Sequence, residues 1–160
     1  EEGTGNLQLR PARAVDAPLL LSILHAAFEE YRGRLDPPSG AHSETINTVR
    51  ERLGKEVAVI AFIDNEAVGC VFYQPESSHM YLGRLSVLPN YRKQGVGRAL
   101  IGYVEQQARI LHIPRVQLGV RIALPQLRDY YARLGYQPVR YETHEGYAQP
   151  TYVLMEKNVA

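Results

Sequence analysis

The 160-residue sequence predicts a mixed α/β fold of the α+β type, with helices on a central, mostly antiparallel sheet. Three observations support this class. Amphipathic helical patterns alternate with short β-branched segments, tight turns join the first strands, and a later strand–helix–strand unit implies one parallel pair. The element order that follows is β-α-α-β-β-β-α-β-α-β-β. Hydrophobic residues form 45% of the chain, which suits one ordinary globular core.

The N-terminal half is expected to contain four strands and two helices. Asp16 is a suitable N-cap for the first helix, and Pro18 falls in its first turn, where a missing N–H costs little. Ser43 is expected to cap the second helix, and Gly54 suits its C-terminal end. Apolar residues recur at helical spacing in the first helix, at Leu20, Ile23, Leu24, Ala27 and Phe28. The expected strands are residues 7–11, 57–63, 67–73 and 80–87.

The C-terminal half begins with the longest helical pattern, over residues 95–111. Its inward positions are predicted to be Leu100, Ile101, Val104, Ala108 and Leu111. A second helix is expected over residues 125–134, ended by Gly135. The remaining strands are predicted at residues 115–120, 137–141 and 151–156. Composition does not change along the chain, so we expect one domain over residues 7–157, with residues 1–6 disordered or originating from cloning.

Bulk properties exclude several classes of function. A formal net charge of +1 argues against a nucleic-acid-binding protein, and no apolar segment approaches the roughly 20 residues that span a membrane. The single cysteine, Cys70, permits no disulfide within the chain, which favours a reducing, cytoplasmic location and a buried structural thiol. The five histidines show no metal-ligand spacing, so no metal is expected.

The most informative segment lies between the strand at 80–87 and the helix at 95–111. It places basic residues and two glycines where a helix begins, in the order Arg92, Lys93, Gln94, Gly95, Val96, Gly97 and Arg98. The first amides of a helix lack intrahelical partners, and the helix dipole makes this end electropositive. The segment therefore predicts a site for a phosphorylated ligand. Neither the P-loop motif nor the three-glycine dinucleotide motif matches it.

The segment resembles the acetyl-CoA-binding motif of the GCN5-related N-acetyltransferase (GNAT) superfamily, here Arg92-x-x-Gly95-x-Gly97. The preceding string, Leu85-x-Val87-x-Pro89-x-Tyr91, extends the resemblance. Residues 130–136, Tyr-Tyr-Ala-Arg-Leu-Gly-Tyr, are similar to a second signature of the family. The resemblance covers residues 7–157 and is strongest over 81–136. It implies a GNAT-like domain that uses acetyl-CoA to acetylate a primary amine.

The resemblance also assigns roles to cofactor-binding residues. The backbone of the Leu85–Val87 segment would pair with the pantetheine arm, and the Val87 amide would polarise the thioester carbonyl. The pyrophosphate would lie on the basic loop. The implied cofactor-binding residues are Leu85, Val87, Arg92, Lys93, Gln94, Gly95, Val96, Gly97 and Arg98.

Catalytic proton transfer is assigned in the same way. Tyr131 matches the tyrosine that protonates the departing CoA thiolate, although the adjacent Tyr130 is an alternative. Some family members use a strand glutamate to take the proton from the amine, and Tyr81 stands at that place here. The general base is therefore open among four residues, Tyr81, His79, Glu142 and His144.

The acceptor is a small-molecule amine or a peptide, with a small amine or amino acid favoured. Tyr31 and Tyr81 are candidate substrate contacts, and Arg84 could pair with a substrate carboxylate or form an internal ion pair. Two alternatives stay open: a protein or peptide N-acetyltransferase, and a non-catalytic acyl-CoA-binding domain. An exposed last strand would offer an edge for a homodimer.

Overall fold

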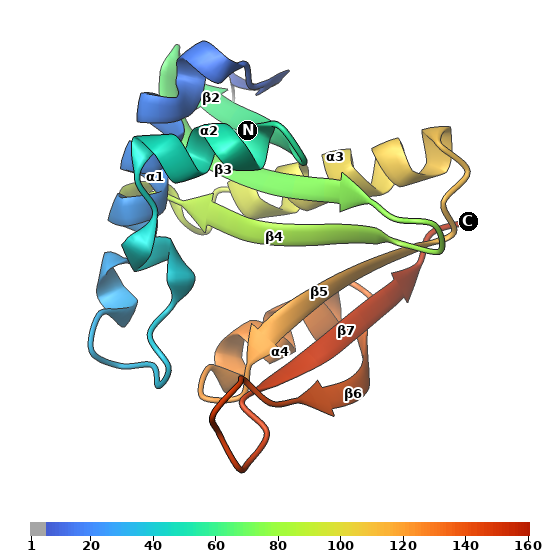
Figure 1. Cartoon of the computed structure of the whole chain (residues 1–160). Coiled ribbons are helices and arrows are strands. Elements are labelled where there is room, and N and C mark those ends of the chain that lie inside the picture. Colours follow the sequence, from blue (N-terminus) through green and yellow to red (C-terminus); the bar gives the residue numbers. More distant parts are fainter. Residues whose placement is uncertain (1–5) are drawn as a thin grey trace. The chain divides into compact units, whose positions relative to one another are not determined.

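The computed structural model describes residues 6–160; residues 1–5, expected to be disordered or to originate from cloning, lie outside the described residues. Its strands are β1 (Leu7–Pro11), β2 (Val57–Ile63), β3 (Glu66–Pro75), β4 (Met80–Val87), β5 (Arg115–Arg121), β6 (Gln137–Glu142) and β7 (Tyr152–Asn158). Its α-helices are α1 (Ala17–Phe28), α2 (Ile46–Leu53), α3 (Val96–Ile110) and α4 (Pro125–Arg133). The predicted element order is confirmed (Figure 1).

The seven strands form a sheet in the order β1-β2-β3-β4-β5-β7-β6. The β4–β5 pair is parallel, whereas the β1–β2, β2–β3, β5–β7 and β6–β7 pairs are antiparallel. The predicted mixed, mostly antiparallel sheet is therefore confirmed. The described residues form two compact units, one of residues 6–74 with 84–104, the other of residues 75–83 with 105–160.

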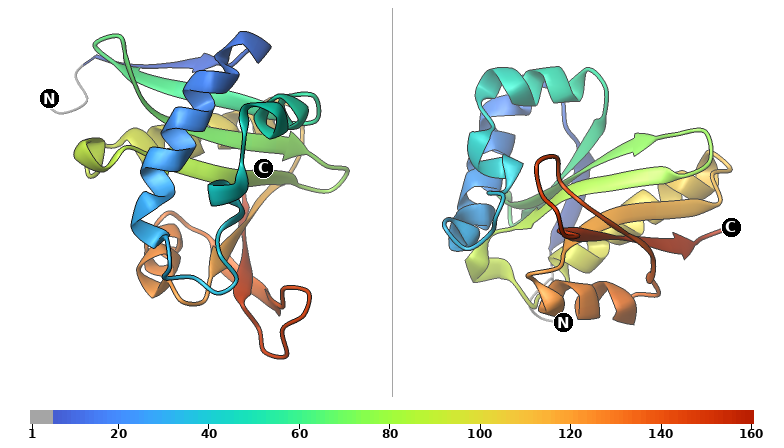
Figure 2. Two further views of the ribbon diagram at one scale, coloured as in Figure 1. Left: turned by 60° about the vertical axis from the view of Figure 1, so that its left-hand side comes forward. Right: turned by 60° about the horizontal axis from the view of Figure 1, so that its bottom comes forward.

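The core of the first unit lies between α1, α2 and one face of β2 and β3 (Figure 2). Its fully buried members are Ala17, Leu20, Ile23, Leu24, Val49, Ala58, Ile60, Cys70 and Phe72. Helical spacing in α1 places four of these side chains on one face, as the sequence predicts. Cys70 is the expected structural thiol, because burial raises its pKa to about 12 and keeps it protonated.

The other face of β3 is covered closely by α3. A Cβ atom added to Gly69 would lie 2.7 Å from the Ser86 carbonyl oxygen and 3.1 Å from a Val96 methyl carbon. Glycine at this position therefore lets α3 and the end of β4 approach the strand. The first turn of α3, which carries the predicted phosphate-binding amides, is thus held against the sheet by packing.

The second unit contains the β5–β7–β6 ladder and α4. β7 pairs with β5 on one side and with β6 on the other. The expectation that the last strand forms an exposed edge is therefore wrong, since β6 takes the outer place. This outcome depends on which strands pair, and that is not encoded in the local pattern of either strand.

Two further local predictions are wrong. The N-cap of α2 is Thr45 rather than Ser43, because the Thr45 side chain accepts from the Thr48 amide, and the Thr48 hydroxyl accepts from the Thr45 amide. Leu111 does not face the core; it follows the end of α3 and is 51% exposed. The other four inward positions predicted for α3 are buried.

Asp16 occupies the predicted N-cap position of α1, but its carboxylate does not accept a hydrogen bond from an amide of this helix. It accepts two hydrogen bonds from the Arg10 guanidinium, at 2.9 and 3.3 Å, and one from the Arg13 amide at 2.8 Å. The hydrogen bonds from Arg10 are the main cause that lowers the pKa of Asp16, against the opposing effect of burial. The carboxylate thus ties β1 to the start of α1.

This pair should make stability depend on acid pH. A carboxylate with a lowered folded-state pKa stabilises the protein above its unfolded pKa, about 3.9, and loses this contribution as the pH falls through the folded value. Asp16→Asn should therefore destabilise the protein by about 1–2 kcal/mol at neutral pH and by much less near pH 2. Urea unfolding at both pH values measures the difference. An equal loss at both would show that the charge of Asp16 does not matter.

Candidate functional site

The predicted phosphate-binding loop joins β4 to α3 in the first unit. A short 3-10 turn, Pro89–Tyr91, follows β4, and α3 begins at Val96. Gly95 has a φ of +85°, which glycine adopts without strain, and its carbonyl accepts the amide of Ala99 at 3.0 Å. Gly95 therefore opens the helix, and the amides of the next three residues cannot have intrahelical partners.

Two of the loop's basic side chains are free to meet a ligand. Lys93 and Arg98 are exposed, and neither forms an ion pair with any of residues 6–160. Lys93 has a φ of +64°, a conformation that side-chain-bearing residues seldom adopt and that often marks functional loops. Two unpaired cations beside unpaired helix amides give this loop a local positive potential.

Arg92 is engaged within the protein instead. Its guanidinium donates to the Val87 carbonyl at 3.2 Å, to the Ala27 carbonyl at 3.1 Å and to Glu30 at 2.6 Å. These contacts attach the loop to the end of α1 and to the end of β4. The side chain of Arg92 thus holds the loop in place. The direction of the loop's last backbone amides is set by the start of α3.

Tyr31, a predicted substrate contact, lies just after α1 in the same unit. Its ring meets that of Phe28 edge-on, with centroids 5.9 Å apart. Burial, and then the neighbouring Glu30 carboxylate, raise the pKa of Tyr31 to about 12. The Tyr31 hydroxyl therefore stays protonated at neutral pH, with the Glu30 carboxylate as its acceptor.

Arg84 departs from regular strand geometry within β4. Its φ is +54°, and its guanidinium donates from Nε and Nη2 to one oxygen of Glu44, at 3.4 and 3.2 Å. Glu44, which lies between α1 and α2, also accepts from Thr48 and Arg52. Burial opposes ionisation of Glu44, but these hydrogen bonds and the two arginine charges outweigh it, so its pKa is lowered. No sequence pattern singled out Glu44, because its partner stands 40 residues away.

Tyr131 belongs to the second unit, on α4. It is 7% exposed, whereas the adjacent Tyr130 is only partly buried, and the two ring centroids are 5.3 Å apart. The Tyr131 ring also meets the edge of Tyr136, at 6.0 Å. The Tyr136 hydroxyl donates to the buried Glu105 carboxylate at 2.9 Å. The Tyr131 ring therefore packs against Tyr130 and Tyr136, and the hydroxyl of Tyr136 is itself fixed by Glu105.

The candidates for the general base lie in different settings. Gly119 on β5 makes room for two tyrosines, since an added Cβ would lie 3.3 Å from the Tyr81 hydroxyl and from the Tyr152 ring. The His144 ring lies 5.0 Å from Tyr152, and burial, followed by the charge of Arg121, lowers the pKa of His144. Tyr81 and Tyr152 thus both lie against Gly119, and His144 packs on Tyr152.

The other two candidates, Glu142 and His79, each have a polar neighbour close in sequence. Glu142 forms an ion pair with Arg140. His79 stands just before β4, and its Nδ1 lies 3.2 Å from the Ser78 hydroxyl. A polar partner therefore does not separate them from His144, whose Nδ1 lies within hydrogen-bond distance of the Thr151 hydroxyl.

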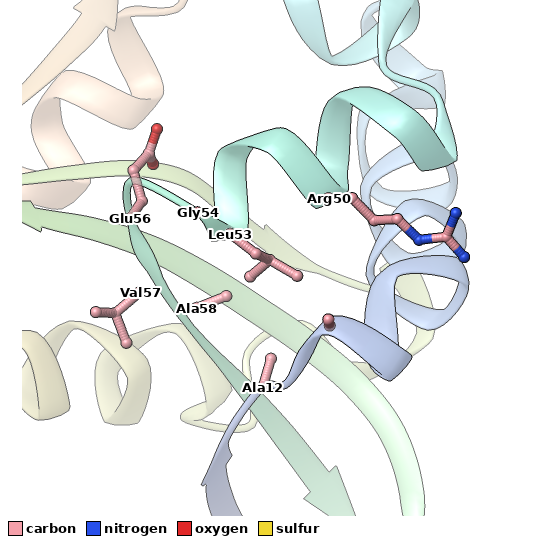
Figure 3. A pocket seen from close by; sticks show the side chains of 8 residues that line it. Ala12, Arg50, Leu53, Gly54, Glu56, Val57 and Ala58 are labelled. Carbon is pink, nitrogen blue, oxygen red and sulfur yellow. The ribbon is translucent and has the colours of Figure 1, made fainter.

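Other kinds of site find little support in the described part of the chain. Residues 6–160 contain no group of three or more His, Cys, Asp or Glu side chains placed to hold a metal ion. None of the helices within that range is both long and apolar enough to cross a bilayer. A pocket of about 370 Å³ lies between α2 and the start of β2 (Figure 3). Its lining contains none of the predicted site residues.

Comparison with known proteins gives a consistent picture. The sequence profile of the acetyltransferase (GNAT) family matches residues 20–136, more than half of the chain. The S-alkylcysteine N-acetyltransferase of Bacillus subtilis (strain 168) is 28% identical over 138 residues, which are 80% of this chain and 77% of that protein.

Solved structures show the same fold at low identity. The PaiA N-acetyltransferase of Thermoplasma acidophilum, solved in complex with coenzyme A, superposes with a TM-score of 0.79 at 17% identity, over 96% of this chain and 99% of that one. The ribosomal-protein alanine N-acetyltransferase of Escherichia coli gives a TM-score of 0.75 at 17% identity, over 96% and 94%.

Proposed function

Because this chain belongs to the acetyltransferase (GNAT) family, we propose that it transfers the acetyl group of acetyl-CoA to a primary amine. The observation that carries the proposal is the loop at the start of α3. It combines helix amides without intrahelical partners with two exposed, unpaired cations, Lys93 and Arg98. This combination suits the pyrophosphate of CoA. The coenzyme A bound to the Thermoplasma relative supports the same cofactor.

The cofactor would be held mainly by backbone groups. In this proposal the amides of residues 94–98 bind the pyrophosphate, while Leu85 and Val87 pair with the pantetheine arm. Lys93 and Arg98 add charge, and Arg92 keeps the loop in place through its contacts with Ala27 and Glu30. Backbone recognition explains why the glycines matter, since each lets the chain approach the phosphates.

The chemical step would be direct attack of a neutral amine on the thioester carbonyl. The new N–C bond forms as the C–S bond breaks, and the Val87 amide stabilises the negative charge that develops on the carbonyl oxygen. Tyr131 gives a proton to the departing CoA thiolate. The amine gives one proton to a general base or to solvent, and Tyr131 regains one from solvent, so the products are the N-acetylated amine and CoA.

The acceptor we favour is a small amine or amino acid. The Bacillus relative, named for acetylation of S-alkylcysteine, supports a small acceptor. The Escherichia coli structure, named for a ribosomal-protein alanine, belongs to a protein acetyltransferase, but at 17% identity it shows the fold alone. Protein or peptide acceptors are therefore the second candidate.

A thermal-shift comparison of three ligands tests the cofactor. Acetyl-CoA and CoA should each raise the melting temperature and ATP should not; a ligand at 100 times its Kd adds about 2.7 kcal/mol of stability. Lys93→Glu should reduce the shift, because it places a negative charge beside the pyrophosphate. Lys55→Glu is the matched control, since Lys55 is also exposed but lies in the turn after α2. No shift with either CoA species would contradict the proposal.

A further inference from the structure

Arg84 occupies a conformation that needs an explanation. A φ of +54° within a strand is uncommon for a residue with a side chain, and such positions persist where surrounding contacts enforce them, often at ligand sites. Arg84 also stands immediately before the Leu85–Val87 segment that we propose holds the thioester. It is therefore placed at the edge of the proposed reaction centre.

The protein fixes one edge of the Arg84 guanidinium. Nε and Nη2 form that edge, and both donate to the same oxygen of Glu44, which is 5% exposed. Gly40 leaves the room this requires, because a Cβ atom there would lie 2.7 Å from Nη2. The guanidinium is thus oriented before any ligand arrives.

The opposite edge of the guanidinium is not used. Nη1 has no hydrogen-bond partner among the described residues, and the Arg84 side chain is 26% exposed. Nη1 and the second N–H of Nη2 form a planar pair of donors, which matches the two oxygens of a carboxylate. A carboxylate bound to these two donors would leave the contact with Glu44 in place.

Glu44 has hydrogen-bond donors other than Arg84. It accepts from the Thr48 hydroxyl at 2.6 Å and from Arg52 as well, so its carboxylate is satisfied from the α2 side. Nearby, in the same segment between α1 and α2, both ring nitrogens of His42 are buried and have no hydrogen-bond partner among residues 6–160. Buried polar atoms without a hydrogen-bond partner in the protein are rare, and such atoms usually bond to a ligand or to water.

We propose that Arg84 binds a carboxylate of the acceptor, so that the acceptor is a free amino acid or another amine with a carboxylate close to its nitrogen. Glu44 and Gly40 are the positioning residues. The inference rests on the proposed acetyl transfer. Arg84 stands three residues before Val87 on β4, so a carboxylate bound to Arg84 and a thioester bound at Val87 would occupy the same segment of this strand.

The test compares matched acceptors. CoA release is measured with free amino acids, including S-alkylated cysteines, and with the amides of the same amino acids, which keep the amine but lose the carboxylate charge. The free acids should have a kcat/KM about 10–100-fold higher than their amides, the usual range for a charge-assisted pair of hydrogen bonds. A wild-type enzyme that prefers the amides would overturn the inference.

Variants then assign this preference to Arg84. Arg84→Met should remove most of the acid-over-amide preference, mainly through a higher KM for the free acids. Gly40→Ala, which keeps the arginine but crowds Nη2, should reduce the preference in part. The control is Arg50→Met, which removes an exposed positive charge on α2 and should leave the preference unchanged.

Two failures can be told apart. If Arg84→Met lowers activity on acids and amides by the same factor, Arg84 is only structural and the carboxylate contact is wrong. If no amine of either series releases CoA above the hydrolysis background, the proposed acetyl transfer fails, and the inference fails with it.

Discussion

Replacing Tyr131 with phenylalanine is expected to lower kcat by about 10²–10⁴-fold, while acetyl-CoA still stabilises the protein as it does the wild type. The change removes one oxygen and keeps the ring. The ring packs against Tyr130 and Tyr136, so the helix should fold normally. The loss would fall on protonation of the CoA thiolate, a step that contributes to turnover and not to cofactor affinity.

Tyr130→Phe is the matched control, because it removes the neighbouring hydroxyl from a less buried ring of the same helix. Steady-state kinetics and thermal shifts with acetyl-CoA should be measured on both variants. We expect the large kinetic loss in Tyr131→Phe alone. The reverse result would transfer the role to Tyr130, and unchanged turnover in both would remove the tyrosine from the mechanism.

The second large effect is on stability and concerns Glu105, on α3. Its buried carboxylate accepts from the Tyr136 hydroxyl at 2.9 Å and from the Lys157 ammonium at 3.2 Å. Glu105→Leu leaves both donors without this partner in a poorly hydrated place. We expect the free energy of unfolding to fall by about 3 kcal/mol, at the lower end for buried pairs because Lys157 keeps some exposure.

Urea unfolding measures this loss, and two controls define its origin. Glu105→Gln keeps an acceptor for the Tyr136 hydroxyl and removes the charge, so its loss should be smaller. Glu51→Leu removes an exposed carboxylate from α2 and should change stability by less than about 0.5 kcal/mol. If Glu105→Leu behaved like Glu51→Leu, the contacts of Glu105 would contribute little to the folded state.

The sequence anticipated the elements because their signals are local. Helical spacing identified the buried face of α1, and the two-residue turn at Asp64 and Asn65, both with positive φ, produced the β2–β3 hairpin. The loop before α3 was predictable for the same reason, since glycine spacing and helix-start chemistry involve only neighbouring residues. Its glycines and free cations lie where the pattern placed them.

The site's supporting contacts were not predictable in this way. Arg92 was expected to meet the cofactor, yet its side chain contacts Glu30, 62 residues earlier. Nothing in the neighbourhood of Glu44 indicated that it would orient Arg84. Glu105 likewise carries no motif that connects it to Tyr136. Each of these contacts joins residues that are brought together only when separate elements pack.

The sequence by itself therefore determined the element order, the parallel pair within a mostly antiparallel sheet, and the basic, glycine-containing loop that opens α3, because periodicity, turn chemistry and helix ends act over a few residues. The tertiary structure alone decided which strand lies at the sheet edge, which edge of Arg84 is free and how Tyr131 is supported. Those outcomes depend on long-range packing and on the exclusion of water from side chains distant in the sequence.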